Sequence, residues 1–136
     1  MSGRMIFLNL PVQDLPRARR FYEALGFRIN EHSSDQGTAS VVVDENIVVT
    51  LLSAERYADF LVGGTDGGPS AGPSVIPCLT AEDRAEVDTL VSRALDAGGG
   101  PWQPPREEGA SYTGSFTDPD GSVWQVRWLD QLHVVN

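Results

Sequence analysis

The sequence has few histidine and cysteine side chains, which are common as catalytic bases, nucleophiles and metal ligands. Its histidines are His32 and His133, and its one cysteine is Cys78. A cysteine nucleophile needs a base that removes its proton, and no histidine is placed to activate Cys78. We therefore interpret Cys78 as a small buried apolar residue. We also find no Ser-His-Asp arrangement, no phosphate-binding glycine loop and no zinc-spaced cysteine pair.

The composition favours one reduced, globular domain over residues 1–136. The chain is 40% hydrophobic and 21% charged, which is enough for a core without disulfides. A single cysteine excludes an internal disulfide and favours a cytoplasmic location, and we expect no secretory signal and no membrane association. The net charge of −9 argues against nucleic acid as a partner. An acidic surface could favour a cationic ligand, but we interpret the charge as serving solubility.

The first half of the chain has the pattern strand, helix, strand, strand, strand. Asp14 is a predicted helix N-cap, Pro16 is compatible with the first turn, and Gly26 is a predicted helix stop. Between them, apolar residues recur at helical spacing. Residues 55–62 are predicted as a short second helix. The predicted strands are residues 5–10, 27–33, 38–44 and 47–53.

The second half repeats this pattern. Asp83 and Glu86 form an acidic helix start akin to a capping box, and the triple glycine at 98–100 ends the helix. Its predicted apolar stripe is Val87, Leu90, Val91, Ala94 and Leu95. The predicted strands are residues 75–81, a weak strand from 102, and residues 111–117 and 123–129.

The two halves, about 1–60 and about 74–136, are joined by a glycine- and proline-rich segment, about 61–73. It is either a plain linker or a mobile flap over a site, and the plain linker is the simpler interpretation. A repeated β-α-β-β-β unit is a stronger signal than any single element. It predicts an α+β fold in which two modules form an open, cup-shaped mixed sheet with helices on the outer face.

The local sequence agrees with this architecture. Residues 12–15 (Val-Gln-Asp-Leu), 21–22 (Phe-Tyr) and 24–27 (Ala-Leu-Gly-Phe) fit the passage from the first strand through the helix, and residues 118–121 (Asp-Pro-Asp-Gly) fit the last hairpin. In this order and at these distances, the chain resembles the vicinal oxygen chelate superfamily, which includes glyoxalase I, bleomycin-resistance proteins and extradiol dioxygenases. The resemblance covers nearly the whole chain.

The resemblance also implies where a metal would bind. Metal-using relatives place one ligand on the first strand and one on the last strand of each module, and these positions fall on or near Phe7, Thr50, Ile76 and Gln125. None of these residues is His, Asp or Glu, and the amide of Gln125 is too weak to hold a metal alone. We therefore expect no metal and no cofactor.

Alternation along the strands then predicts which side chains line the cup. The cup set comprises Phe7, Asn9, Val48, Thr50, Leu52, Ile76, Cys78, Thr80, Val123, Gln125 and Arg127. The opposite set is uniformly apolar, as a helix-covered face should be: Ile6, Leu8, Leu10, Val49, Leu51, Leu79, Trp124, Val126 and Trp128. Of the cup set, we expect Phe7, Asn9, Thr50, Leu52, Ile76, Cys78, Gln125 and Arg127 to bind the ligand. Arg127 could hold an anionic group, pair with an acidic neighbour, or lie at a strand end in water.

Two functions follow from the resemblance. The first is a small-molecule-binding protein of the bleomycin-resistance type that sequesters an antibiotic or metabolite, commonly as a homodimer. The second is a lyase, isomerase or dioxygenase of the glyoxalase superfamily with a non-standard site. It would need either a metal bound by other residues or a metal-free mechanism that uses Tyr112, Cys78 or Arg127. The absence of the usual metal ligands favours the first.

Overall fold

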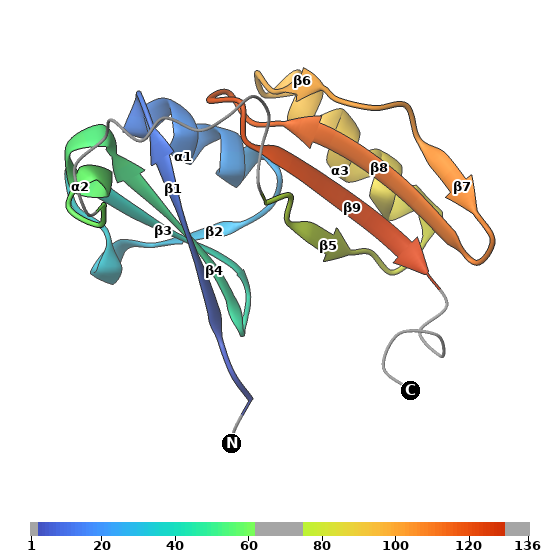
Figure 1. The fold of residues 1–136 in the computed structure, drawn as a ribbon, viewed down its shortest axis with the longest axis horizontal. Coiled ribbons are helices and arrows are strands. Elements are labelled where there is room, and N and C mark those ends of the chain that lie inside the picture. Colours follow the sequence, from blue (N-terminus) through green and yellow to red (C-terminus); the bar gives the residue numbers. More distant parts are fainter. Residues whose placement is uncertain (1–2, 62–74, 130–136) are drawn as a thin grey trace. The chain divides into compact units, whose positions relative to one another are not determined.

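A computed structural model describes residues 3–61 and 75–129 of the chain. The chain divides into two compact units, residues 1–71 and 72–136. Each unit has its own mixed sheet, open at its edges, with a helix along one face, so the predicted α+β class with two modules is confirmed (Figure 1). Most of the predicted linker, 61–73, lies outside the described residues. In the described part of the chain, no helix is long and apolar enough to cross a membrane.

The first unit follows the predicted order of elements. It contains β1 (Ile6–Val12), α1 (Leu15–Ala24), β2 (Arg28–Asn30), β3 (Thr38–Asp44), β4 (Ile47–Ser53) and α2 (Ala54–Ala58). The strand order is β1-β4-β3-β2, with β1 parallel to β4 and the other pairs antiparallel. The parallel pair exists because α1 and two strands separate β1 from β4 in the sequence, which gives the chain room to cross over.

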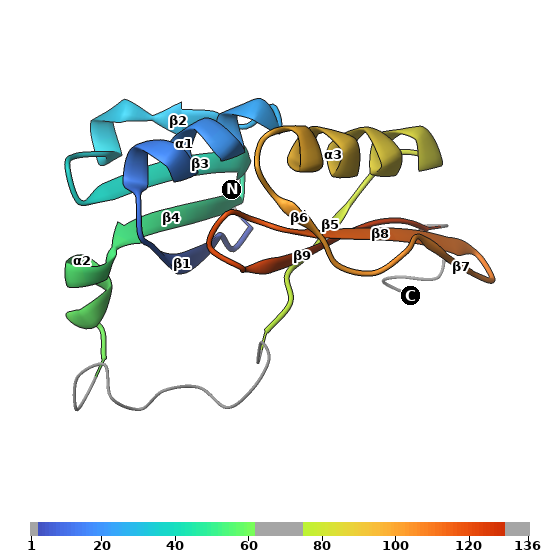
Figure 2. The ribbon, with the colours of Figure 1, turned by 90° about the horizontal axis from the view of Figure 1, so that it is seen from above.

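Helix α1 begins and ends where the sequence predicts. The Asp14 carboxylate accepts a hydrogen bond from the Arg17 backbone N–H at 3.0 Å, and Gly26 has a φ of +104°. Its inner face buries Ala18, Phe21 and Tyr22 against the sheet, and burying each aromatic ring contributes about 1.5–3 kcal/mol. Figure 2 shows α1 along one face of this sheet.

The second unit repeats this arrangement with one difference. It contains β5 (Cys78–Thr80), α3 (Arg84–Asp96), β6 (Gly100–Pro101), β7 (Arg106–Glu108), β8 (Ser111–Thr117) and β9 (Val123–Leu129). The strand order is β5-β9-β8-β6, and β7 also pairs with β8. The strand predicted from residue 102 was wrong in its start, because β6 ends at Pro101 and β7 begins only at Arg106. Prolines at 104 and 105 cannot donate to the ladder and interrupt it.

Helix α3 packs directly on the backbone of β8. A Cβ atom at Gly114 would lie 2.8 Å from Val91 Cγ2, so only glycine allows this close approach. The Arg84 guanidinium lies 5.5 Å and 5.2 Å from the ring centroids of Tyr112 and Trp128. The Tyr112 hydroxyl donates to Asp88 Oδ1 at 2.6 Å. These contacts show that the face carrying Tyr112 and Trp128 is covered by the helix.

Some sequence predictions were wrong in detail. The strand expected at 27–33 ends at Asn30 and continues as a 3₁₀ turn at Glu31–Ser33, because the Asn30 side chain accepts the His32 backbone N–H at 3.1 Å. The strand expected at 75–81 contains only Cys78–Thr80, so Ile76 precedes it. Leu95 is 42% exposed, although it was expected in the apolar stripe of α3. The capping residue Asp83 does accept the Glu86 backbone N–H, at 2.8 Å.

Candidate functional site

In each unit, the sheet face opposite α1 or α3 carries the polar side chains of the strands. In the first unit, the paired positions Asn9, Thr50, Ser40 and Asn30 form a row across all four strands. Residues paired directly across strands place their side chains on the same face. The other face is apolar, and Ala39, Val41, Val49 and Leu51 are fully buried there. We call the polar side of each sheet its open face.

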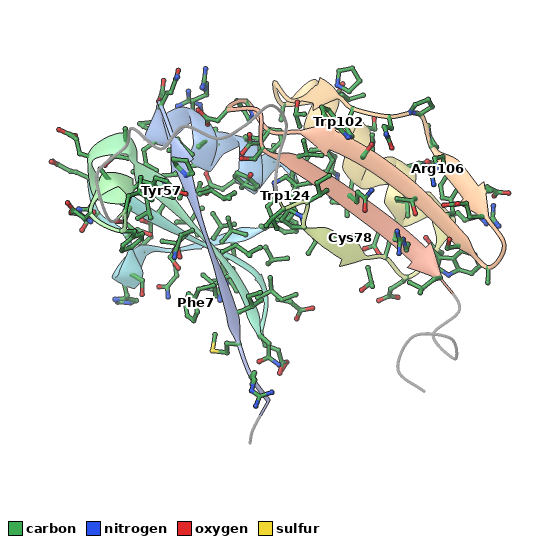
Figure 3. The ribbon with its side chains drawn as sticks, in the orientation of Figure 1. Phe7, Tyr57, Cys78, Trp102, Arg106 and Trp124 are labelled. Atoms are coloured by element: carbon green, nitrogen blue, oxygen red, sulfur yellow. The ribbon has the colours of Figure 1, made fainter. Side chains whose placement is uncertain are left out.

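The predicted ligand residues of the first unit differ in exposure. Phe7 is 57% exposed, Asn9 is exposed and Thr50 is partly exposed, so these side chains are accessible. Leu52, in contrast, is buried, with 4% of its surface exposed. Thr38 is the residue paired with Leu52 in the sheet, and its hydroxyl accepts a hydrogen bond from Arg56 of the neighbouring helix α2. Figure 3 marks Phe7 on β1.

The open face of the second unit follows the same register. Cys78, Gln125 and Ser115 form one row, and Thr80, Arg127, Thr113 and Arg106 form the next. The row Asn9-Thr50-Ser40 thus corresponds to Cys78-Gln125-Ser115. In both units, the polar side chain of the last strand lies between a polar residue of the first strand and a serine. This repeat supports the predicted register within each unit.

A small pocket of about 50 Å³ lies on this face of the second unit. It brings together two predicted residues, Gln125 and Arg127, and contains neither Cys78 nor Ile76. The remaining lining residues come from β8, β7 and the segment before β7: Gln103, Pro104, Arg106, Glu108, Thr113 and Ser115. Figure 3 marks Arg106 on β7 and Cys78 on β5.

Sequence reasoning missed these lining residues for two reasons. Thr113 and Ser115 alternate along the predicted strand 111–117, so the same period-two argument would have placed them on the open face. Gln103 and Arg106 lie in the proline-interrupted stretch, where periodicity carries no signal. Gln103 reaches the pocket because its backbone N–H donates to the Ser115 hydroxyl at 3.0 Å.

Arg127 is the electrostatic centre of this pocket. Its Nε–H donates to the Thr113 hydroxyl at 3.1 Å, and among the described residues no carboxylate forms an ion pair with it. Arg106, in contrast, pairs with Glu108 at 2.7 Å. The Gln125 side chain, two residues from Arg127, likewise has no hydrogen-bond partner in the described part of the chain.

Cys78 is exposed, so its interpretation as a buried apolar residue was wrong. It lies on β5 at the edge of its sheet, where one strand neighbour is absent from the sheet order. Partial burial of the sulfur raises the pKa of the Cys78 thiol, and the nearby charge of Arg127 acts in the opposite direction. A raised pKa means that the thiol holds its proton more tightly than a free cysteine does.

A larger and more open groove lies beside α1 in the first unit. Its walls are one face of the helix and the loop before β3, and they are rich in charged residues: Leu15, Pro16, Arg19, Arg20, Glu23, Asp35 and Gln36. No strand residue lines this groove. Asp35 is already held by the Gly37 backbone N–H and by Arg56, which lower the pKa of its carboxyl. We therefore place the candidate site on the open faces.

Within residues 3–61 and 75–129, no three His, Cys, Asp or Glu side chains are grouped closely enough to hold a metal ion. His32 is exposed on the 3₁₀ turn. His133 lies outside the described residues.

Comparisons with known proteins agree with this architecture. The family model for the bleomycin resistance protein-like N-terminal region matches residues 4–44. A hypothetical protein from S. aureus, SA1046, is 30% identical, with 94% of each chain covered and a TM-score of 0.75. No curated protein sequence matches the chain.

Two more distant structures share the fold. A glyoxalase/bleomycin resistance protein/dioxygenase family enzyme from Burkholderia phytofirmans PsJN is 18% identical over 94% of this chain and 100% of its own, with a TM-score of 0.77. A lactoylglutathione lyase from Agrobacterium tumefaciens is 20% identical over 100% of both chains, with a TM-score of 0.68. The chain therefore belongs to the glyoxalase/bleomycin-resistance/dioxygenase group of proteins, the vicinal oxygen chelate superfamily.

Proposed function

We propose that this protein binds a small organic molecule on the open faces of its sheets and does so without a divalent metal. The observation that carries the proposal is the pair Gln125 and Arg127, which line one pocket. Of their side-chain donors, only the Nε–H of Arg127 has a protein partner among the described residues, the Thr113 hydroxyl, so the Arg127 Nη groups and the Gln125 amide remain to bind a ligand. Small-molecule sites typically combine apolar walls with a few such polar groups. The open face of the first unit, taken by itself, offers the same combination, because exposed Phe7 is apolar and Asn9 and Thr50 are polar.

The residues at the family's metal positions do not fit a divalent ion. Phe7 and Ile76 have no donor atoms, Thr50 offers a neutral hydroxyl, and a metal site needs carboxylate, imidazole or thiolate ligands. Their strand neighbours do not supply a set either, because Asn9 and Ser40 flank Thr50, and Cys78 and Ser115 flank Gln125. The proposed site therefore binds its ligand through protein side chains alone.

The alternative is an enzyme with a metal-free site, which would need an activated side chain. Burial raises the pKa of Cys78, and the hydrogen bond to Asp88 raises the pKa of Tyr112, so both hold their protons more tightly than free side chains do. Tyr112 also lies on the helix-covered side with Arg84. Binding therefore has more support than catalysis.

The proposal is tested by screening a library of small organic compounds for thermal stabilisation and then measuring the dissociation constants of the compounds that stabilise the protein. Gln125→Trp fills the open face of the second unit and should weaken binding at least about tenfold. Thr89→Trp is the matched control, because Thr89 is exposed on α3 away from the open face. Equal weakening by both variants, or no stabilising compound at all, contradicts the proposal. Turnover of a compound would instead support the alternative, an enzyme with a metal-free site. Formation of lactoylglutathione is the first reaction to assay.

A further inference from the structure

We propose that the pocket of the second unit is a carboxylate subsite, in which Arg127 and Gln125 bind the acid group of the ligand. This inference rests on the proposed function and adds the chemical class of the ligand. It follows from three features of the pocket: its charge balance, the geometry of the free donors and its size.

The lining of the pocket has one positive charge in excess. It contains two arginines and one glutamate, so 2 − 1 leaves a net charge of +1, in a chain whose net charge is −9. Glu108 is already paired with Arg106, so the excess charge belongs to Arg127. Arg127 is partly buried on β9, and a partly buried cation gains more from an anionic partner than an exposed one does. The pocket therefore favours a monoanion over a neutral or cationic group.

The pocket donors that have no partner among the described residues match the shape of a carboxylate. The Thr113 hydroxyl accepts a hydrogen bond from the Nε–H of Arg127. The two Nη groups at the end of the guanidinium therefore remain for a ligand. These two groups form a planar fork that binds both oxygens of one carboxylate. Gln125 is two residues away on the same face of β9, and its amide can donate to the same acid group. A single Lys-like point charge would not select this planar group.

The size of the pocket sets how much of the ligand it holds. A volume of about 50 Å³ is several times the ~10–15 Å³ that a cavity needs to hold one water molecule. It is far below the ~300–1,000 Å³ of pockets that enclose a drug-sized ligand. The pocket therefore holds the acid group alone, and the rest of the ligand lies outside it. The apolar part of the ligand must find its contacts elsewhere on the open face.

A matched pair of probes, benzoate and benzamide, tests the subsite because they share a ring and differ in charge. Each is titrated into isotope-labelled protein, and the side-chain signals of Gln125 and Arg127 are followed by NMR. We expect benzoate to bind at least about tenfold more tightly than benzamide, because one charge-assisted bidentate contact changes affinity by about this factor. Arg127→Met should remove the preference for benzoate. Arg127→Lys keeps the charge but not the planar fork, so it should retain only part of this preference.

Two further variants keep the result interpretable. Glu108→Gln changes an exposed residue and releases Arg106, so it should strengthen benzoate binding without loss of packing. Arg93→Met removes the same charge from the exposed surface of α3 and should leave benzoate binding within about twofold of wild type. Benzoate preference that survives Arg127→Met, or no benzoate shift at Gln125 and Arg127, overturns the carboxylate subsite. Neutral compounds from the screen that still bind and still respond to Gln125→Trp would then leave the proposed function standing.

Discussion

The two faces of β9 should respond very differently to truncation to alanine. Val126 is 1% exposed on the helix-covered face, whereas its neighbour Gln125 lies on the open face and is only partly buried. Val126→Ala deletes two buried carbon groups at about 0.8 kcal/mol each. A residual cavity adds to this loss, so we expect about 1.5–3 kcal/mol of lost stability.

Gln125→Ala should cost less than about 0.5 kcal/mol. Its side chain has no hydrogen-bond partner among the described residues. Its backbone N–H donates to the Pro77 carbonyl at 2.9 Å, and this bond does not depend on the side chain. Its removal therefore leaves no buried polar group without a partner. The difference between the two neighbours follows only from which face each side chain occupies.

Urea unfolding followed by tryptophan fluorescence measures both variants. All three tryptophans, at 102, 124 and 128, belong to the second unit, and Trp124 is 1% exposed, so the signal reports on the sheet that contains β9. Equal losses of stability in the two variants would refute the assignment of faces. A larger loss for Gln125→Ala would mean that the strand register is shifted by one residue.

Four further predictions use independent measurements. Thr50→Trp should weaken ligand binding with little change in stability, whereas Leu51→Trp should cost about 1–3 kcal/mol, and urea unfolding that gives the reverse order would contradict the register of β4. Elemental analysis of purified protein should find no stoichiometric Zn, Ni, Fe or Mn; about one tightly bound ion per chain, lost together with an activity, would overturn this. Light scattering at micromolar concentration should give twice the 14.7 kDa chain mass, and a monomer would count against the dimer. Because the pKa of Cys78 is raised, alkylation of this exposed thiol near about pH 8 should be slower than that of a free cysteine, and Arg127→Met should slow it further; faster alkylation would show that the thiol is activated.

Much of the fold was predictable because local signals and the global architecture agree. The Asp14 and Asp83 caps, the glycine stop at Gly26 and the 118–121 hairpin all lie where the sequence placed them. In the hairpin, the Asp118 side chain accepts the backbone N–H of Ser122 at 2.8 Å, and Gly121 has a φ of +93°. The caps, the glycine stop and the hairpin are all local features in which the residue type dictates the backbone conformation.

The site was less predictable because it depends on tertiary neighbours. Alternation places Gln125 and Arg127 on the open face, but it does not show that Arg106 is paired while Arg127 is not. Cys78 was misinterpreted because its position at a sheet edge, which leaves it exposed, comes from strand order and not from local sequence. Leu52 shares the alternation of Thr50 but is buried, since α2 lies beside it.

A crystal structure of the protein with a compound from the ligand screen tests the central claim most directly. We predict that the compound contacts Gln125 and Arg127 on the open face of the second unit, with its acid group on the Arg127 guanidinium and no metal ion between ligand and protein. A compound bound in the charged groove beside α1, or held by a metal ion at Gln125, would contradict the account.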